Sequence, residues 1–282
     1  MRRRLLVAVA LFGLFASAAH AQSTLGEEVP YIRTPQVVAD KMLDLAEVGP
    51  DDFLIDLGSG DGRIVITAAQ KRGARGFGVE LDPSLVEASN AAARKAGVAE
   101  RARFFARDLF DTDIREASVL TMYLLPEVNL QLRPRLLAQL KPGTRVVSHD
   151  WDMGEWQPDA RAVVEGLAKP VMPVQMSTVY LWIVPARVAG SWRLQVEGAG
   201  AEQAMELEFT QRFQEISGIA KRTRGRTLLQ SAHLRGPEIR FAVIDETRRP
   251  SEPLHFFGRV YGDTMEGTTG GGRRWYAERK PR

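Results

Sequence analysis

The most constraining feature of the sequence is a glycine-rich turn between an apolar stretch and an amphipathic one. Residues 56–63 read Asp-Leu-Gly-Ser-Gly-Asp-Gly-Arg and continue the apolar stretch 53–57. A turn of this kind lets the backbone approach a nucleotide-like ligand at the N-terminus of the following helix. The glycines at 58, 60 and 62 have G-x-G-x-G spacing, whereas dinucleotide-binding turns carry G-x-G-x-x-G. The segment therefore predicts a strand, a turn and a helix that together bind a nucleotide-like ligand other than a dinucleotide.

Helical and strand-like patterns alternate around this turn, from about Val37 to Pro185. Such alternation is typical of α/β units around a mostly parallel sheet with helices on both faces. Helices are predicted from Thr34-Pro35 to near Gly49-Pro50 and at 63–71, 83–96 and 129–140. Strands are predicted at 53–57, 76–81, 102–106, 119–123, 145–148 and 178–184, while 162–167 fits either a short strand or half a helix. We therefore expect an α/β domain over residues 22–188.

The helical periodicity disappears beyond Pro185. Strand-like runs separated by turns follow at 192–196, 205–219, 227–234, 239–244, 254–261, 265–268 and 273–278. About seven to eight short strands predict a small antiparallel β-barrel or sandwich over residues 189–282. Trp192 and Trp275, near the two ends of this part, are expected to fill its interior.

The N-terminus has the pattern of a secretory signal peptide. Three arginines at positions 2–4 precede an apolar run over 5–19, which ends in Ala19-His20-Ala21. We expect cleavage after residue 21 and export to the periplasm or cell envelope, with no stable membrane span after cleavage. The alternative is a retained N-terminal anchor, which would also place the domain outside the cytoplasm.

Composition narrows the function further. The 38 basic residues exceed the 35 acidic ones only through the three arginines of the leader, so a general nucleic-acid-binding role has no electrostatic support. The absence of cysteine excludes a disulfide scaffold and a thiol nucleophile. The histidines at 149, 233 and 255 are scattered along the sequence, and no metal site is predicted.

Carboxylates follow three successive predicted strands. Asp56 and Asp61 would repel a pyrophosphate but would attract a ligand that carries an ammonium and a sulfonium. Glu80 ends the next strand, where it can accept both hydroxyls of a ribose. Asp108 follows the third strand, beside Leu109, where it can accept the adenine amine. Because these strand ends meet at one crevice, the sequence predicts a site for S-adenosylmethionine.

At this point the chain resembles a known family. Val29-Pro-Tyr31, Thr34-Pro35 and the turn with its continuation to Val65 are similar to class I, seven-strand, Rossmann-like S-adenosylmethionine-dependent methyltransferases. The resemblance covers about residues 29 to 185, and more narrowly these motifs look like those of the bacterial relatives of the protein-lysine methyltransferases that modify the ATP synthase c-subunit. It implies that the glycine turn lies against the methionine moiety and that the two later acids hold the ribose and the adenine. The implied cofactor residues are Asp56, Gly58, Gly60, Gly62, Glu80 and Asp108, with Ser59 and Leu109 as further candidates in the same segments.

Four further residues are candidates for the methyl-acceptor side. Tyr123 and Glu127 follow the fourth strand, and His149 and Asp150 follow the fifth, so all four are expected on the cofactor side of the sheet. Their alternative roles are a core tyrosine, a helix-start acid, a loop anchor and a solvated loop acid. Tyr31 precedes the first helix and either closes over the cofactor or forms a hydrophobic staple.

Two functions of different classes remain open from the sequence. The first is an exported methyltransferase that acts on an acceptor such as a protein lysine, with the β-rich part assisting substrate capture or envelope attachment. The second is a non-catalytic envelope protein that retains the nucleoside pocket as a sensor and binds a ligand through the β-barrel. The complete set of acidic positions favours the enzyme.

Overall fold

The computed structural model describes residues 32–165, 176–198, 204–222, 225–244 and 252–281. Contacts within the chain separate residues 1–32 from a unit that extends from Arg33 to Arg282 and holds two β-sheets. The predicted signal peptide and Tyr31 lie outside the described residues. Among the described residues, no helix combines the length and the apolar character that crossing a membrane requires.

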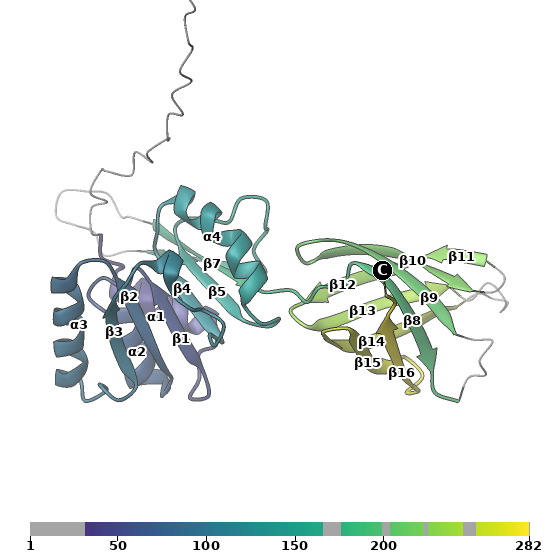
Figure 1. Cartoon of the computed structure of the whole chain (residues 1–282), viewed down its shortest axis with the longest axis horizontal. Coiled ribbons are helices and arrows are strands. Elements are labelled where there is room, and N and C mark those ends of the chain that lie inside the picture. Colours follow the sequence, from purple (N-terminus) through teal and green to yellow (C-terminus); the bar gives the residue numbers. More distant parts are fainter. Residues whose placement is uncertain (1–31, 166–175, 199–203, 223–224, 245–251, 282) are drawn as a thin grey trace, which may run out of the picture. The chain divides into compact units, whose positions relative to one another are not determined.

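The first sheet has seven strands in the order β3-β2-β1-β4-β5-β7-β6 (Figure 1). Its first five strands are mutually parallel, whereas β7 is antiparallel to β5 and β6 is antiparallel to β7. This arrangement confirms the predicted α/β fold. The strands are β1 (Phe53–Leu57), β2 (Arg75–Glu80), β3 (Ala102–Ala106), β4 (Val119–Met122), β5 (Arg145–His149), β6 (Ala160–Glu165) and β7 (Met176–Ile183).

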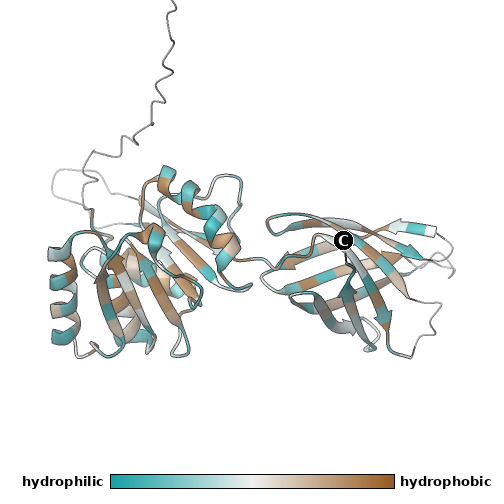
Figure 2. Ribbon diagram, viewed as in Figure 1, coloured by the Kyte–Doolittle hydropathy of each residue, from teal (hydrophilic) through white to brown (hydrophobic). Residues whose placement is uncertain are grey.

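Alternating residues of these strands point to two hydrophobic cores, one on each face of the sheet. On one face, Leu54 packs with buried residues of α1 (Gln36–Leu45), α2 (Arg63–Arg72) and α3 (Pro83–Lys95). On the other face, Ile55 packs with Leu132 and Leu136 of α4 (Pro126–Gln139). Figure 2 shows hydrophobic residues along the strands of the first sheet, whereas α3 carries both hydrophobic and hydrophilic residues. Helices therefore cover both faces, as the sequence predicted.

Local sequence explains where the helices next to the site begin. Gly62 precedes α2 with a φ of +77°, a left-handed conformation that glycine adopts without strain. Asp82 caps α3 by accepting a hydrogen bond from the Ser84 amide at 2.8 Å, and Pro83 occupies the first helical position. Both helices thus start within a few residues of the carboxyl end of a strand.

Some predicted boundaries were wrong. Helix α4 begins at Pro126 and not at 129, because proline is favoured in the first turn of a helix. Residues 205–219 form two strands, since Phe213 adopts a left-handed φ of +54° and reverses the chain without a glycine or proline. Residues 227–234 are also divided, because one strand ends at Leu228 and the next begins at Gln230, and the pairing of this second strand is irregular between Gln230 and His233. The ambiguous stretch at 162–167 is a strand up to Glu165, and its last two residues lie outside the described part.

The second sheet is antiparallel and has nine strands in the order β11-β10-β9-β8-β16-β15-β14-β13-β12. Its terminal strands β11 and β12 are consecutive in the chain, and β12 also approaches β10, so the sheet curls into a nearly closed barrel. Trp192 and Trp275 lie in its core with at most 2% exposure, which confirms their predicted place. The strands are β8 (Gly190–Val196), β9 (Met205–Arg212), β10 (Glu215–Arg222), β11 (Gly225–Leu228), β12 (Gln230–Arg235), β13 (Glu238–Ile244), β14 (Pro253–Tyr261), β15 (Thr264–Thr269) and β16 (Arg274–Arg279).

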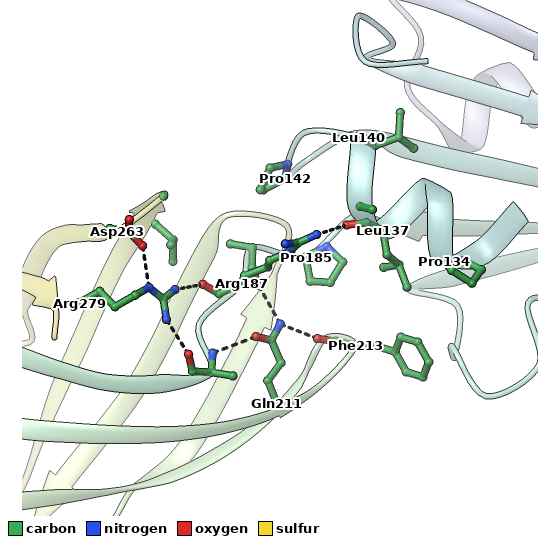
Figure 3. A pocket seen from close by; sticks show the side chains of 15 residues that line it. Pro134, Leu137, Leu140, Pro142, Pro185, Arg187, Gln211, Phe213, Asp263 and Arg279 are labelled. Carbon is green, nitrogen blue, oxygen red and sulfur yellow. Dashed lines mark hydrogen bonds and ion pairs between the residues drawn. The ribbon is translucent and has the colours of Figure 1, made fainter. Parts of the chain in front are cut away.

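The segment between β7 and β8, where the domain boundary at 188/189 is predicted, is fixed by two side chains of the second sheet (Figure 3). The Gln211 amide accepts a hydrogen bond from the Val188 amide at 2.7 Å and donates one to the Ala186 carbonyl at 2.7 Å. The Arg279 guanidinium donates to the Ala189 carbonyl at 2.6 Å. These contacts satisfy backbone groups in a stretch that belongs to neither sheet.

Candidate functional site

The glycine turn lies at the carboxyl end of β1 and is bonded to the end of β2. The backbone amides of Gly58 and Ser59 both donate to the Val79 carbonyl, at 3.0 and 2.9 Å. The glycines at 58, 60 and 62 all have left-handed φ values, of +76°, +52° and +77°. Three such residues within five positions hold the turn in a shape that other residues would strain.

Close packing adds a second reason for glycine in this turn. A Cβ atom on Gly62 would lie 2.5 Å from the ring of Phe104, and one on Gly58 would lie 2.8 Å from a methyl group of Leu124. The second distance also shows that the segment after β4 lies directly against the turn. The hydroxyl of Ser59 is buried and has no hydrogen-bond partner among the described residues.

Asp56 is the buried carboxylate at the base of the turn. Its side chain accepts a hydrogen bond from the Thr121 hydroxyl at 2.7 Å, between two strands whose register places the residues side by side. Burial raises the pKa of Asp56 to about 7, against the lowering effect of the Thr121 bond, and the nearby charges of Glu80 and Asp61 add to the rise. The carboxylate therefore lies in a negative potential that a bound cation would relieve.

Glu80 fastens the turn to the next strand. One carboxylate oxygen accepts from the Gly60 amide at 3.1 Å, and the other accepts from the Leu81 amide at 2.8 Å. The side chain is partly exposed, and each carboxylate oxygen can accept more than one hydrogen bond. It can thus accept ribose hydroxyls while it keeps these backbone contacts.

Asp61 has a different environment from the other acids. The Arg63 guanidinium donates to it at 2.9 Å, and Arg33 lies within 3.8 Å. Although burial acts in the opposite direction, these contacts with Arg63 hold the pKa of Asp61 below its usual value. The charge of Asp61 is thus already paired with Arg63, and its attraction for a cationic ligand stays a prediction. Arg63 also donates to the Thr34 carbonyl at 2.7 Å, which ties α2 to the start of α1.

Asp108 and Leu109 lie in the turn after β3. Asp108 caps the short 3-10 helix η1 (Leu109–Asp111) by accepting from the Phe110 amide at 2.8 Å. The Arg107 amide donates to the Glu80 carbonyl at 3.0 Å, so the ends of β2 and β3 are joined just before Asp108. Asp108 is exposed and Leu109 is partly buried, which leaves a polar and an apolar group available beside the predicted adenine position.

The residues present fit S-adenosylmethionine. The turn combines a buried hydroxyl, to which no described residue is bonded, with a buried carboxylate whose ionised form needs a cation. A sulfonium or an ammonium satisfies that requirement, whereas a pyrophosphate would add to the repulsion. Glu80 and Asp108 supply acceptors at the ends of the next two strands.

A second cluster lies at the ends of β4 and β5. The rings of Tyr123 and His149 are tilted by 34° with centroids 3.9 Å apart, and the Asp150 carboxylate lies near the Tyr123 hydroxyl. Burial raises the pKa of Tyr123, and the charge of Asp150 contributes in the same direction. Asp150 has a left-handed φ of +61° and also accepts from the Thr178 amide at 2.8 Å. A left-handed backbone conformation is uncommon outside glycine, and such residues cluster at functional sites. The conformation of Asp150 at the end of β5 therefore makes it a candidate functional residue.

His149 holds this cluster in place. It is 2% exposed, and its nitrogens lie 3.2 Å from the Thr34 hydroxyl and 2.9 Å from the Ser177 hydroxyl. Burial holds the pKa of His149 below its usual value, although Asp150, 3.3 Å away, opposes that effect. Both ring nitrogens are therefore engaged with hydroxyls, which is the arrangement expected of a loop anchor, its alternative role.

Glu127 lies apart from these contacts, exposed in the first turn of α4. A carboxylate there interacts favourably with the helix dipole, which matches its alternative role as a helix-start acid. Asn129, two residues later, is fully buried and donates from its amide to the Ser148 hydroxyl at 3.2 Å and the Trp151 carbonyl at 3.2 Å. It joins α4 to the loop after β5.

Sequence reasoning missed several residues that shape the site. Thr34 bonds both His149 and Arg63, and thereby joins the cluster at β5 to the glycine turn. Ser177 and Thr121 complete the partners of His149 and Asp56. Thr34 was singled out in the sequence only as a helix start and as part of the resemblance, and Thr121 had a signal as a polar residue inside an otherwise apolar strand.

Comparison with known proteins identifies the family. The ANTKMT methyltransferase domain matches residues 56–160. A protein-lysine N-methyltransferase of Saccharolobus islandicus (strain REY15A) is 42% identical over 161 residues, which cover 55% of this chain and 94% of that protein. The ATP synthase c-subunit lysine N-methyltransferase of Mus musculus is 40% identical over 106 residues, which cover 38% of this chain and 42% of that protein.

A solved structure agrees with these matches. The crystal structure of an RNA methyltransferase from Salinibacter ruber in complex with S-adenosyl-L-homocysteine has a TM-score of 0.51 and 52% identity, over 56% of this chain and 96% of that chain. Sequence, fold and the chemistry of the glycine turn thus indicate the same cofactor, S-adenosylmethionine. The chain belongs to the family of S-adenosylmethionine-dependent protein-lysine methyltransferases.

Proposed function

We propose that this methyltransferase acts on the side-chain amine of a protein lysine, which it receives at the cluster of Tyr123 and Asp150. The observation that carries the proposal is the position of this cluster. Leu124, next to Tyr123, lies against Gly58 of the glycine turn, so the acceptor cluster and the cofactor turn are neighbours. The known lysine methyltransferases that the chain resembles support the choice of acceptor.

Within this site we assign the cofactor contacts by position. The glycine turn and Asp56 hold the methionine moiety, Glu80 holds the ribose, and Asp108 with Leu109 holds the adenine. When bound, the cofactor supplies an electrophilic methyl group on a sulfonium. The chain contributes alignment of the acceptor nitrogen and exclusion of water, because a methyl transfer disperses charge and needs little other assistance.

The acceptor side must also handle a proton. A lysine amine is protonated at neutral pH and becomes a nucleophile only after it loses that proton. The Asp150 carboxylate can bind the incoming ammonium, orient its nitrogen and take a proton from it, while the Thr178 amide holds the carboxylate in place. General base assistance of this kind contributes roughly 10²- to 10⁴-fold to a rate.

The test is a methylation assay with the variants Asp150→Asn and Tyr123→Phe. Asparagine tolerates the left-handed backbone at position 150 and can still accept from the Thr178 amide, so the change removes the charge alone. We expect kcat on a lysine-containing acceptor to fall about 100-fold in Asp150→Asn, with cofactor affinity unchanged. Asp152→Asn is the matched control, because Asp152 is an exposed acid of the same loop. Equal activity of Asp150→Asn and wild type would refute the assignment.

The same assay decides between acceptor classes. The relative from Salinibacter ruber is described as an RNA methyltransferase, which makes RNA the second candidate acceptor. Total protein and total RNA from one cell extract should be incubated with radiolabelled cofactor and the purified chain. Label in protein that is released as methyl-lysine after hydrolysis supports the proposal, and label confined to RNA overturns it.

We further propose that the chain is exported, on the basis of the arginines and the apolar run in residues 1–21. The barrel-like second sheet would then assist substrate capture or attachment to the envelope. The measurement is the N-terminal sequence of the protein from fractionated cells. A start at Gln22 in the periplasmic or envelope fraction supports export, whereas an intact N-terminus confined to the cytoplasm contradicts it.

A further inference from the structure

Arg135, in the middle of α4, binds backbone carbonyls of the turn that follows β3. Its guanidinium donates to the carbonyl of Leu109 at 2.9 Å and to that of Phe110 at 2.5 Å, and it also donates to the carbonyl of Thr112. The remaining nitrogen, Nε, donates to Gln139 one helical turn further on, at 3.2 Å. One side chain thus satisfies three backbone acceptors that lie outside regular hydrogen bonding.

These carbonyls belong to η1 and the residue after it, the turn that carries Asp108 and Leu109. A turn this short has few internal bonds. Asp108 accepts from the Phe110 amide at 2.8 Å, and the buried Thr112 hydroxyl donates to the Asp108 carbonyl at 2.8 Å. Without a cation at their meeting point, the converging carbonyl dipoles would repel one another.

The contact with these carbonyls requires the shape of an arginine side chain. The planar guanidinium presents five donors in a fixed fork and can bond several carbonyls at once. A lysine at the same position would keep the charge, but its single ammonium cannot hold the same fork of acceptors. The charge of Arg135 alone therefore does not account for the arrangement.

We propose that Arg135 is a positioning residue that holds the adenine-facing turn in its binding conformation. The inference rests on the proposed cofactor contacts of Asp108 and Leu109. Among the residues that the structure describes, Arg135 itself bonds the backbone of the turn and its own helix. Its effect on the cofactor passes through the fraction of time that the turn is correctly shaped, and this fraction scales the apparent dissociation constant.

The second consequence concerns α4 as a whole. The same helix begins at Pro126, two residues after Leu124 and three after the acceptor-side residue Tyr123. Arg135 thus joins the adenine-facing turn to the helix that supports the acceptor side, while the chemistry itself takes place away from it. Loss of Arg135 should weaken cofactor binding and leave the rate at saturating cofactor unchanged.

The test is Arg135→Lys in the full chain, with Arg135→Gln as a second variant. We expect the dissociation constants of both S-adenosylhomocysteine and free adenosine to rise about tenfold in each variant, with kcat at saturating cofactor within twofold of wild type. Adenosine is the informative probe, because it lacks the methionine moiety and reports on the adenine and ribose contacts alone. Arg115→Lys is the matched control, since Arg115 pairs with Asp113 by its side chain in the same region and is expected to have no effect.

Each outcome decides the matter. Full affinity for adenosine in Arg135→Lys, or a fall in kcat without a change in affinity, overturns the proposal. So does failure of both variants to fold, because a residue that only positions one surface turn is not required for the fold. Asp108→Ala separates the inference from its premise. If it binds adenosine normally, the assigned adenine contact is wrong, and if it binds weakly while Arg135→Lys binds normally, only the role of Arg135 is wrong.

Discussion

Replacing Asp56 with asparagine should stabilise the cofactor-free protein and weaken its hold on the cofactor. The buried carboxyl has a pKa near 7 in the folded protein against 3.8 for a free aspartate. Asparagine has nearly the same shape and can still accept from the Thr121 hydroxyl, whose bond to Asp56 measures 2.7 Å. The substitution therefore removes a buried charge while it keeps the packing.

The sign and size of the effect follow from proton linkage. Between about pH 4 and pH 7 the folded chain retains a proton on Asp56 that the unfolded chain has lost, so wild-type stability falls as the pH rises through this window and levels off above it. A pKa rise from 3.8 to about 7 corresponds to a total of about 4 kcal/mol. From pH 5 to pH 8 the advantage of Asp56→Asn over wild type should grow by about 2 to 3 kcal/mol, or roughly 4 to 12 °C in Tm.

Differential scanning calorimetry of Asp56→Asn and wild type at several pH values measures the difference between their Tm values. Asp51→Asn, a change at an exposed aspartate before β1, controls for the loss of one negative charge. In titration calorimetry the variant should bind S-adenosylmethionine more weakly, and wild type should release a proton on binding below pH 7. A gap between the two Tm values that stays constant from pH 5 to pH 8 would refute the reasoning.

Three further predictions concern the glycine turn, the ribose contact of Glu80 and the ion pair between Asp52, before β1, and Arg145, at the start of β5. Gly62→Ala places a Cβ 2.5 Å from the Phe104 ring at a φ of +77° and should lower the free energy of unfolding by about 3 kcal/mol in a urea titration. Gly97→Ala, at a φ of +71° in open space, should lower it by about 1 kcal/mol. Equal losses in the two variants would show that packing against Phe104 is not the cause. Glu80→Gln should weaken S-adenosylhomocysteine binding about 10- to 30-fold in titration calorimetry, and a change within twofold would contradict the ribose assignment. Arg145→Met leaves the Asp52 carboxylate, 11% exposed, without its ion-pair partner and should lower the free energy of unfolding by about 3 kcal/mol. The double variant with Asp52→Asn should lose less than the sum of the two single variants. Strict additivity in thermal unfolding would show that the two side chains do not stabilise each other.

The cofactor half of the site could be predicted because its determinants are local. The glycine spacing demands left-handed backbone within one turn, and all three glycines adopt it. The carboxylates at positions 56, 80 and 108 stand at the ends of successive strands, and parallel strands bring their ends to one edge of the sheet. The spacing of these acids along the sequence is therefore enough to predict that they lie at one edge of the sheet, because each acid is positioned by the end of its own strand.

The acceptor half depends on contacts between distant parts of the chain. His149 is held by Thr34, 115 residues earlier, and by Ser177, 28 residues later. No periodicity records such a pairing, and each hydroxyl is an ordinary residue in its own segment.

The sequence by itself thus determined the alternation of strands and helices along the chain, the glycine turn and the acids around it. These features depend on backbone conformation and strand direction, which are set over a few residues. Only the tertiary structure decided which acids stay unpaired. Arg63 neutralises Asp61, whereas Asp56 is buried with a hydroxyl as its partner. It also showed that His149 contacts the Ser177 hydroxyl and that Arg135 donates to the carbonyl of Leu109, 26 residues away. The physical reason is that the charge and the hydrogen bonds of a side chain depend on its neighbours in space, which the fold chooses after local structure has been set.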